Sequence, residues 1–236
     1  MCPKMTEWRT AKGGKQTLAF TIYLFRMSSE HWYRNTTWSG ETEAAFNTKL
    51  ARSRSQKAQY LRIQGSVLKD MEPVAAIGLF QRCIDERDDS HIAHAYLDMA
   101  HAYYVAGDLE SALISLEAAM AQQARQPMFR TSAAYDHAML VALHERTERY
   151  ELVLSNLDRS NEAYFASMTF QAESARAVIY SFQGRTEEAH AAAHRALAAE
   201  ADQIGWIPGH PQVGVMPNSD NPLSKRIRAI AASGGR

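Results

Sequence analysis

The sequence predicts an all-α protein made of repeated helix-turn-helix pairs. Apolar residues recur at three- and four-residue intervals, as they do on amphipathic helices. Within residues 91–120 two such runs meet at Gly107-Asp108, where the glycine can end one helix and the aspartate can cap the next. Comparable breaks occur at Glu72, Arg149 and Arg185. These four turns are 36, 41 and 36 residues apart, so we expect about four stacked helix pairs.

Each expected helix has a local reason to begin where it does. Ser39 can cap a helix over about 40–53, and an apolar stripe continues over a helix at about 56–69. Pro73 suits the first turn of the helix that follows. The remaining helices are expected in the two halves of 91–120, over about 129–146 and 149–158, and on both sides of Gly184.

The composition is that of an ordinary folded protein without net charge. Hydrophobic residues make up 46% and charged residues 22% of the chain. Lysine plus arginine number 26, as do aspartate plus glutamate, so no overall field draws the molecule to nucleic acid or to an anionic membrane. The two cysteines, Cys2 and Cys83, exclude a disulfide framework and a cysteine zinc site, and they favour a cytoplasmic location.

The pattern divides the chain into four segments. Residues 1–27 are expected to be a disordered or extension segment, because their short apolar run lacks the cleavage site of a secretory signal. Residues 28–55 form an aromatic N-terminal cap and a first helix, and residues 56–202 form the repeats. Residues 203–236 form a tail rich in proline and glycine, and its segment 204–221 is expected to fold back over the last repeat or into the groove. We expect this tail to end in a short basic helix over about 222–232.

The stretch AHAYYVAGDLESALISLEAA resembles a tetratricopeptide repeat. It has small residues at the crowded sites (Ala100, Ala112 and Ala119) and Tyr103 on the buried face. The pair over about 170–200 is similar, whereas the pairs over 57–85 and 129–160 are more degenerate. The resemblance implies a helix-turn-helix repeat solenoid, an α-α superhelix. Members of this family usually hold an extended peptide or a partner helix in a concave groove, which implies a scaffold or adaptor without a cofactor.

The first helix of each pair lines that groove in the family. By register, the resemblance places eight residues there: Leu61, Leu68, Lys69, His94, Leu97, His101, Tyr104 and Tyr135. The lysine and asparagine set with which some members clamp a peptide carboxyl terminus is missing. The partner is therefore expected to be a protein or peptide of another kind, and a second copy of the chain is an alternative.

The segment 28–38 is unusually rich in aromatic residues. One interpretation is a cap, because the open end of a helical stack needs a cover. The other is a recognition segment, since side chains of these types are enriched at binding hot spots. The residues concerned are Trp32, Tyr33, Arg34 and Trp38.

Two further hypotheses come from other classes of function. Residues 49–62 carry basic side chains and no acidic one, so Arg52, Arg54 and Lys57 could bind nucleic acid or a nucleotide, although a solvated face also explains them. Glu187, His190 and His194 have the spacing of three metal ligands on one helix, as in a helical metalloenzyme. Chance spacing in an alanine-rich helix is the better explanation of these histidines, because no fourth ligand can be identified, and no catalytic motif occurs. We therefore expect no enzyme and no metal site.

Overall fold

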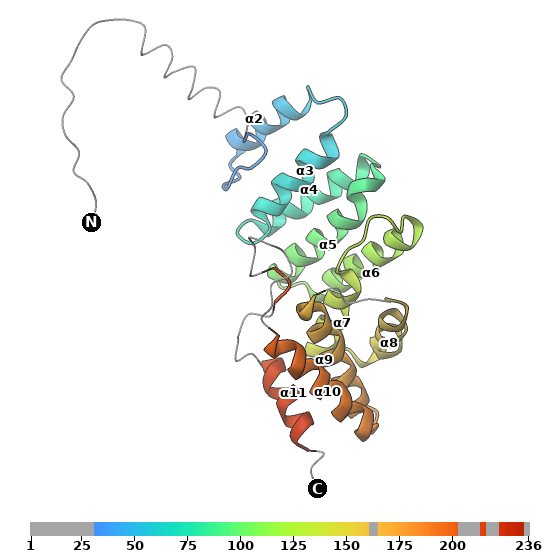
Figure 1. Cartoon of the computed structure of the whole chain (residues 1–236). Coiled ribbons are helices and arrows are strands. Elements are labelled where there is room, and N and C mark those ends of the chain that lie inside the picture. The colour runs from blue at the N-terminus through green and yellow to red at the C-terminus, as the bar shows by residue number, and fades with distance from the viewer. Residues whose placement is uncertain (1–30, 161–164, 203–212, 216–221, 234–236) are drawn as a thin grey trace, which may run out of the picture.

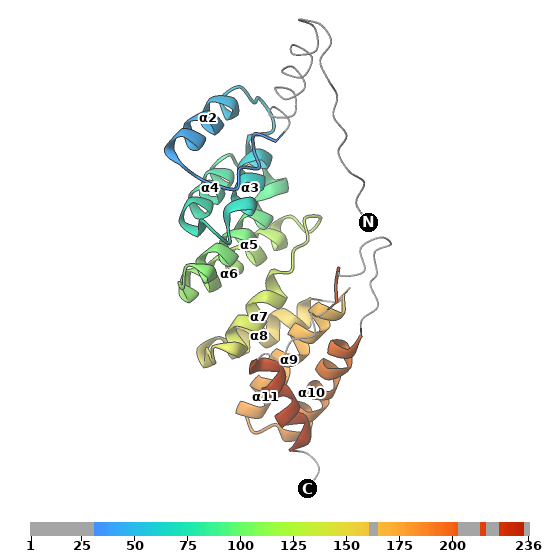
Figure 2. The same cartoon turned by 90° about the vertical axis from the view of Figure 1, so that its left-hand side faces the viewer.

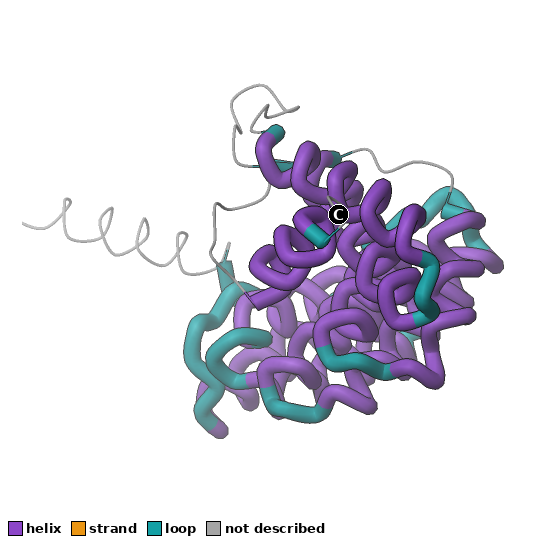
Figure 3. The backbone as a smooth tube through the Cα atoms, turned by 90° about the horizontal axis from the view of Figure 1, so that it is seen from below, coloured by secondary structure: helices purple, strands orange, loops and turns teal. Residues whose placement is uncertain are grey.

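The computed structural model describes residues 31–160, 165–202, 213–215 and 222–233, and the all-α prediction is confirmed there (Figure 1). These residues form ten α-helices and one 3₁₀ turn, with no strand (Figure 3). The expected extension 1–27 lies outside the described residues, as does much of the tail. The elements are α2 (Gly40–Leu50), α3 (Lys57–Leu68), α4 (Pro73–Asp85), α5 (Asp89–Val105), α6 (Leu109–Arg125), α7 (Ala133–Leu143), η1 (Thr147–Arg149), α8 (Tyr150–Arg159), α9 (Ala166–Phe182), α10 (Thr186–Ala201) and α11 (Pro222–Ala232).

The helices stack in chain order from α2 at one end to α10 and α11 at the other (Figures 1 and 2). Each helix from α3 to α7 packs against the next along the chain, and α9 packs against α10. The first helices of neighbouring pairs also meet, α3 with α5 and α7 with α9. The molecule is therefore elongated, and one helix pair follows another along its length.

The turn register predicted from the sequence is confirmed. Its four points, Glu72, Asp108, Arg149 and Arg185, are the residues that directly precede α4, α6, α8 and α10. Gly107 has a φ of 83°, a left-handed conformation that glycine adopts without strain. Asp108 then accepts a hydrogen bond from the Ser111 N–H at 3.0 Å and caps α6.

The long middle interval has two causes, a loop over 126–132 and the 3₁₀ turn Thr147–Arg149. An extended first helix, which would also explain the interval, is excluded because α7 has only 11 residues. Glu145 ends this helix with a φ of 52°, where the best-formed pairs have glycine. This turn therefore lacks the glycine that marks the turns before α6 and α10.

Buried side chains form two large clusters that are joined by a small one. The first cluster belongs to α2 through α5, and the second belongs mainly to α7 through α11. The small third cluster connects them and contains Ala100, Leu116, Ala119 and Ala133. The small cluster thus lies where α5, α6 and α7 meet, and Leu113 of α6 already belongs to the second large cluster.

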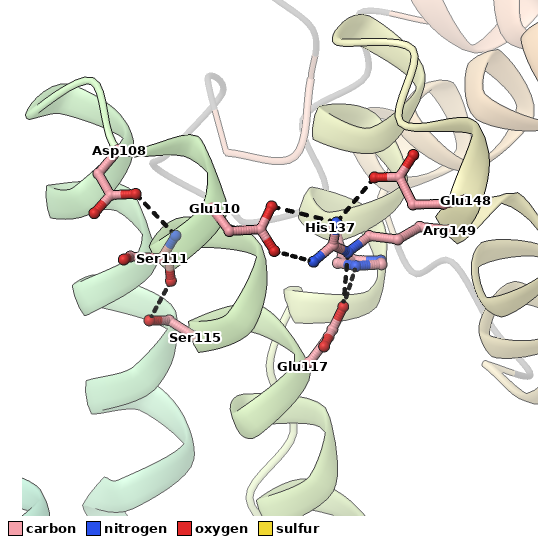
Figure 4. Close-up of polar contacts among 8 residues, drawn as sticks. All are labelled: Asp108, Glu110, Ser111, Ser115, Glu117, His137, Glu148 and Arg149. Atoms are coloured by element: carbon pink, nitrogen blue, oxygen red, sulfur yellow. Dashed lines mark hydrogen bonds and ion pairs between the residues drawn. The ribbon is translucent and has the colours of Figure 1, made fainter.

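A polar network spans this boundary beside the small cluster (Figure 4). The Arg149 guanidinium pairs with the Glu110 carboxylate of α6, and its Nε donates to Oε1 of Glu117 at 3.2 Å. His137 of α7 is fully buried, and its Nε2 lies 3.3 Å from the same Glu117 oxygen. Charged hydrogen bonds therefore tie α6 to α7 and α8 beside the small apolar cluster.

The aromatic segment covers the open end of the first cluster. The ring centroid of Trp32 lies 4.8 Å from that of Tyr60 and 5.3 Å from that of Phe46, and Trp38 lies 5.4 Å from Phe46. Tyr33 stacks on Tyr60 at 4.7 Å. This packing favours the cap interpretation for Trp32, Tyr33 and Trp38. Arg34 of the same segment is exposed, with its guanidinium 5.5 Å from the Tyr33 ring.

The described parts of the tail lie against the last helix pair. The basic helix expected over 222–232 is confirmed as α11, which packs on α9 and α10. Gly214 accepts a hydrogen bond from the Ser167 N–H at 2.9 Å, next to the start of α9. Of residues 204–221, for which the fold-back was expected, the structure describes 213–215 alone, and the expectation stays a prediction for the segment as a whole.

Candidate functional site

A cleft of about 330 Å³ lies between α5 and α7, at the boundary between the two large clusters. Its volume is at the lower end of the range of about 300–1,000 Å³ that is usual for ligand sites. The lining mixes apolar and polar side chains from α5, α6 and α7 with one from the end of α3. These residues are Lys69, Leu97, Asp98, Ala100, His101, Tyr104, Leu116, Ser132, Asp136, Met139 and Leu140.

The apolar walls come from both helices. Leu97 stands on the α5 side, Met139 and Leu140 on the α7 side, and all three are partly buried. Ala100, small and only 2% exposed, lies with them. Tyr104 is 39% exposed, and its ring meets that of His144 edge to face at 5.7 Å. An aromatic ring of this kind is available to a ligand that enters the cleft.

Asp98 is the more strongly held of the two carboxylates in the cleft. Lys69 Nζ donates to its Oδ1 at 2.9 Å, Ser66 Oγ donates to its Oδ2 at 2.8 Å, and Arg62 Nη1 lies 3.4 Å from the same Oδ2. Two cations and a hydroxyl from α3 thus surround one carboxylate of α5. This charge is balanced within the protein, and the ion pairs hold α3 against α5.

Asp136, in the first turn of α7, has neutral partners only. It accepts hydrogen bonds from Ser132 Oγ at 2.7 Å and from Gln171 Nε2 at 2.9 Å. Among the described residues no lysine, arginine or histidine forms an ion pair with it. Burial raises the pKa of the Asp136 carboxyl, and this effect outweighs the two hydrogen bonds and the more distant charges of His101 and Lys69.

His101 lies at the exposed side of the cleft. Its Nε2 is 2.6 Å from Oδ1 of Asp70, which lies in the turn after α3. The imidazole is therefore directed toward its own carboxylate partner. Lys69 and His101 therefore both contact an acidic residue other than Asp136.

Four of the eight residues predicted for the groove line this cleft: Lys69, Leu97, His101 and Tyr104. His94 is partly buried on the same helix but outside the lining, and burial is the main cause that lowers its pKa. Three of the four residues predicted on α5 thus line this cleft, and contact of these residues with a partner stays a prediction.

The groove prediction was wrong for Leu61, Leu68 and Tyr135. Their exposed fractions are 1%, 0% and 7%, and all three belong to the large buried clusters. On α3 and α7 the residues that line the cleft come one position later than Leu68 and Tyr135, at Lys69 and Asp136, and Arg62, one position after Leu61, pairs with Asp98 of the lining. One residue turns a helix by about 100°, so a register error of one position exchanges the open face for the buried one.

Sequence reasoning missed Asp98, Ser132 and Asp136. Ser132 and Asp136 had a signal, since a serine before a helix with an acid four residues later often pairs with it. Asp98 gave no local signal, because its partners are on α3, about 30 residues earlier in the chain.

The basic side chains of the stretch 49–62 differ in exposure, and one of them is already paired with a carboxylate. Arg62 is paired with Asp98, whereas Arg52 and Arg54 are exposed in the loop between α2 and α3. Lys57 is partly buried in the first turn of α3. Nucleic-acid binding by Arg52, Arg54 and Lys57 stays an untested prediction.

The structure gives no support to a metal centre at Glu187, His190 and His194. Throughout the described ranges, no three histidine, cysteine or acidic side chains gather as metal ligands. Nε2 of His190 instead lies 3.1 Å from Ser233 Oγ of the segment that follows α11.

In the part of the chain that the structure describes, no helix is both long and apolar enough to cross a membrane.

Comparisons with protein-family models, with curated proteins and with solved structures found no match to this chain.

Proposed function

We propose that the chain is a cytoplasmic adaptor that binds an extended peptide or a partner helix in the cleft between α5 and α7, and that its helix pairs form a tetratricopeptide-type solenoid. The regular turn register and the burial of the small residues Ala100, Ala112 and Ala119 support the fold part of this proposal. In such a solenoid, α3, α5, α7 and α9 form the binding face, and the cleft opens between two of these helices.

The combination of side chains in the cleft carries the functional part. Leu97, Met139 and Leu140 provide apolar contact area, and Tyr104 adds an aromatic ring that is still 39% exposed. Tyrosine is among the side chains that most often dominate binding energy at interfaces. The carboxylate of Asp136 supplies a polar group that can fix the orientation of a ligand.

Peptide display tests the proposal directly. We would pan a random heptapeptide library against the immobilised full chain and measure the affinity of the selected peptides by fluorescence polarisation. Tyr104→Ala is expected to weaken their binding about tenfold or more, as the loss of a central aromatic contact does. Met128→Ala, which removes another large exposed side chain that does not line the cleft, serves as the control and should leave affinity unchanged.

Either of two results would overturn the proposal. One is a library that yields no binding peptide. The other is a set of peptides whose affinity is the same for the parent chain, Tyr104→Ala and Leu97→Ala, because binding would then occur elsewhere on the surface.

A further inference from the structure

Of the three carboxylates in or beside the α5–α7 cleft, two are in contact with basic side chains of the described part of the chain, and Asp136 is not. Asp98 has Lys69 and Arg62, and Asp70 has His101. Asp136 has a hydroxyl and an amide as its partners and no counter-ion among the described residues. A carboxylate in a partly desolvated site is stabilised when a cation approaches it.

The surroundings of Asp136 suit a cation that is carried on a long apolar stem. Leu97, Met139 and Leu140 line the cleft beside it and can cover the methylene groups of a lysine or arginine side chain. Tyr104 adds a ring face that attracts a cationic head. A cleft of about 330 Å³ has room for one such side chain together with part of a peptide backbone.

We propose that the cleft binds a lysine or arginine side chain of the partner peptide, with the Asp136 carboxylate as its counter-ion. This inference rests on the proposed peptide-binding function and adds the chemical class of the anchoring residue. Ser132 and Gln171, which hold the two oxygens of Asp136, act as positioning residues for that carboxylate.

An acidic anchor fits less well. The two basic side chains that line the cleft, Lys69 and His101, already contact Asp98 and Asp70 at 2.9 and 2.6 Å. A ligand carboxylate would have to compete for them, and it would face Asp98 and Asp136 in the same cleft.

The test uses the same random heptapeptide library on three proteins: the parent chain, Asp136→Asn and the control Asp85→Asn, which changes an exposed carboxylate of α4. The parent and the control should select peptides with lysine or arginine enriched at one position. Asp136→Asn should lose this enrichment while it still selects apolar flanking residues. The substitution keeps the shape of the side chain and removes only its charge.

Chemical modification of the ligand gives a second readout that does not depend on the variant. When the selected lysine is replaced by Nε-acetyl-lysine, affinity for the parent chain should fall about tenfold or more, because the ammonium charge is lost. If Asp136→Asn fails to fold, this comparison decides the question alone.

The outcomes separate this inference from the proposed function. Selected peptides that lack a basic residue, or that are enriched in aspartate or glutamate, overturn the inference while their dependence on Tyr104 sustains the peptide-binding function. Equal binding of lysine and acetyl-lysine peptides does the same. A failure to select any peptide overturns the proposed function itself.

Discussion

Gln64 of α3 is completely buried, and its amide forms three hydrogen bonds with Asn35. Its Oε1 accepts from the backbone N–H and from Nδ2 of Asn35, each at 2.9 Å, and its Nε2 donates to the Asn35 carbonyl at 2.7 Å. The aromatic segment is therefore fastened to α3 by polar contacts as well as by ring packing.

Removal of this amide should release the cap. Gln64→Leu removes the partner of the Asn35 backbone N–H and carbonyl, whereas Asn35 Nδ2 keeps its bond to the Trp32 carbonyl. We expect a loss of about 1–3 kcal/mol in unfolding free energy. Urea denaturation followed by tryptophan fluorescence, to which Trp32 and Trp38 contribute, measures it. Gln81→Leu, at an exposed position of α4, is the control and should change stability by less than about 0.5 kcal/mol.

Two glycines on facing helices should respond in opposite ways to alanine. A Cβ at Gly65 of α3 would lie 2.6 Å from the Phe80 ring, so Gly65→Ala is expected to destabilise the chain by about 1–3 kcal/mol. A Cβ at Gly78, in the middle of α4, meets nothing within 4 Å. Gly78→Ala should stabilise the chain by about 0.5–1 kcal/mol, and equal effects at the two sites in thermal unfolding would contradict the packing described.

His137 should make stability depend on pH. Burial is the main cause that lowers the pKa of this imidazole below its usual 6.5, although Glu117 opposes the shift. The unfolded chain then binds the proton more readily, so stability falls as the pH decreases through 6.5 toward the lower pKa of the folded state. His91 and His94 shift in the same direction, also mainly through burial, and add to the fall.

The contribution of His137 is isolated by comparison of variants. Between about pH 7 and pH 5, the unfolding free energy of His137→Gln should fall less steeply with decreasing pH than that of the parent chain. The two slopes should differ by at most about 1.4 kcal/mol per pH unit. His194→Gln, which removes an exposed imidazole from α10, controls for the loss of a histidine. Equal slopes for the parent and His137→Gln would show that the buried ring does not titrate with folding.

Arg149 should stabilise the boundary between the two clusters. Arg149→Met keeps part of the stem but removes the bonds to Glu110 and Glu117, and we expect a loss of about 1–2 kcal/mol. A double-mutant cycle with Glu110→Gln should give a coupling energy of about 0.5–1 kcal/mol that decreases with added salt. Strict additivity of the two substitutions would show that the pair contributes nothing.

Cys83 should be unreactive in the folded chain. Burial raises the pKa of this thiol to about 12, so little thiolate exists near neutral pH, and the side chain has no exposed surface. In a Cys2→Ser variant, labelling by a thiol reagent at about pH 8 should be slow in buffer and complete in guanidinium chloride. Rapid labelling of the folded protein would mean that α4 opens easily.

Much of the fold could be predicted because its signals are local. Gly107-Asp108 and Gly184 mark turns by their own backbone chemistry, and apolar spacing shows which stretches are helical. The third turn was harder to place, because Glu145 adopts a left-handed conformation that nothing in its residue type announces. The loop before α7 gave only one signal, an interval longer than its neighbours.

The candidate site depends on distances that local patterns do not contain. Leu97 and Tyr104 were found because both lie on a well-marked face of α5. Leu61 and Tyr135 were misplaced because the register of their degenerate helix pairs was uncertain by one residue, enough to turn the wrong face outward. Asp136 became a candidate only when the structure showed which charges were already paired.

The small cluster between α5–α6 and α7 also bears on how the chain unfolds. Each end has its own core, and nearest-neighbour contacts determine how strongly one end cooperates with the other. A peptide in the cleft would touch α5 of one core and α7 of the other. The free energy of peptide binding would then add to the coupling between the two cores. If the two cores unfold in separate steps without peptide, they should unfold in a single step when the peptide is bound.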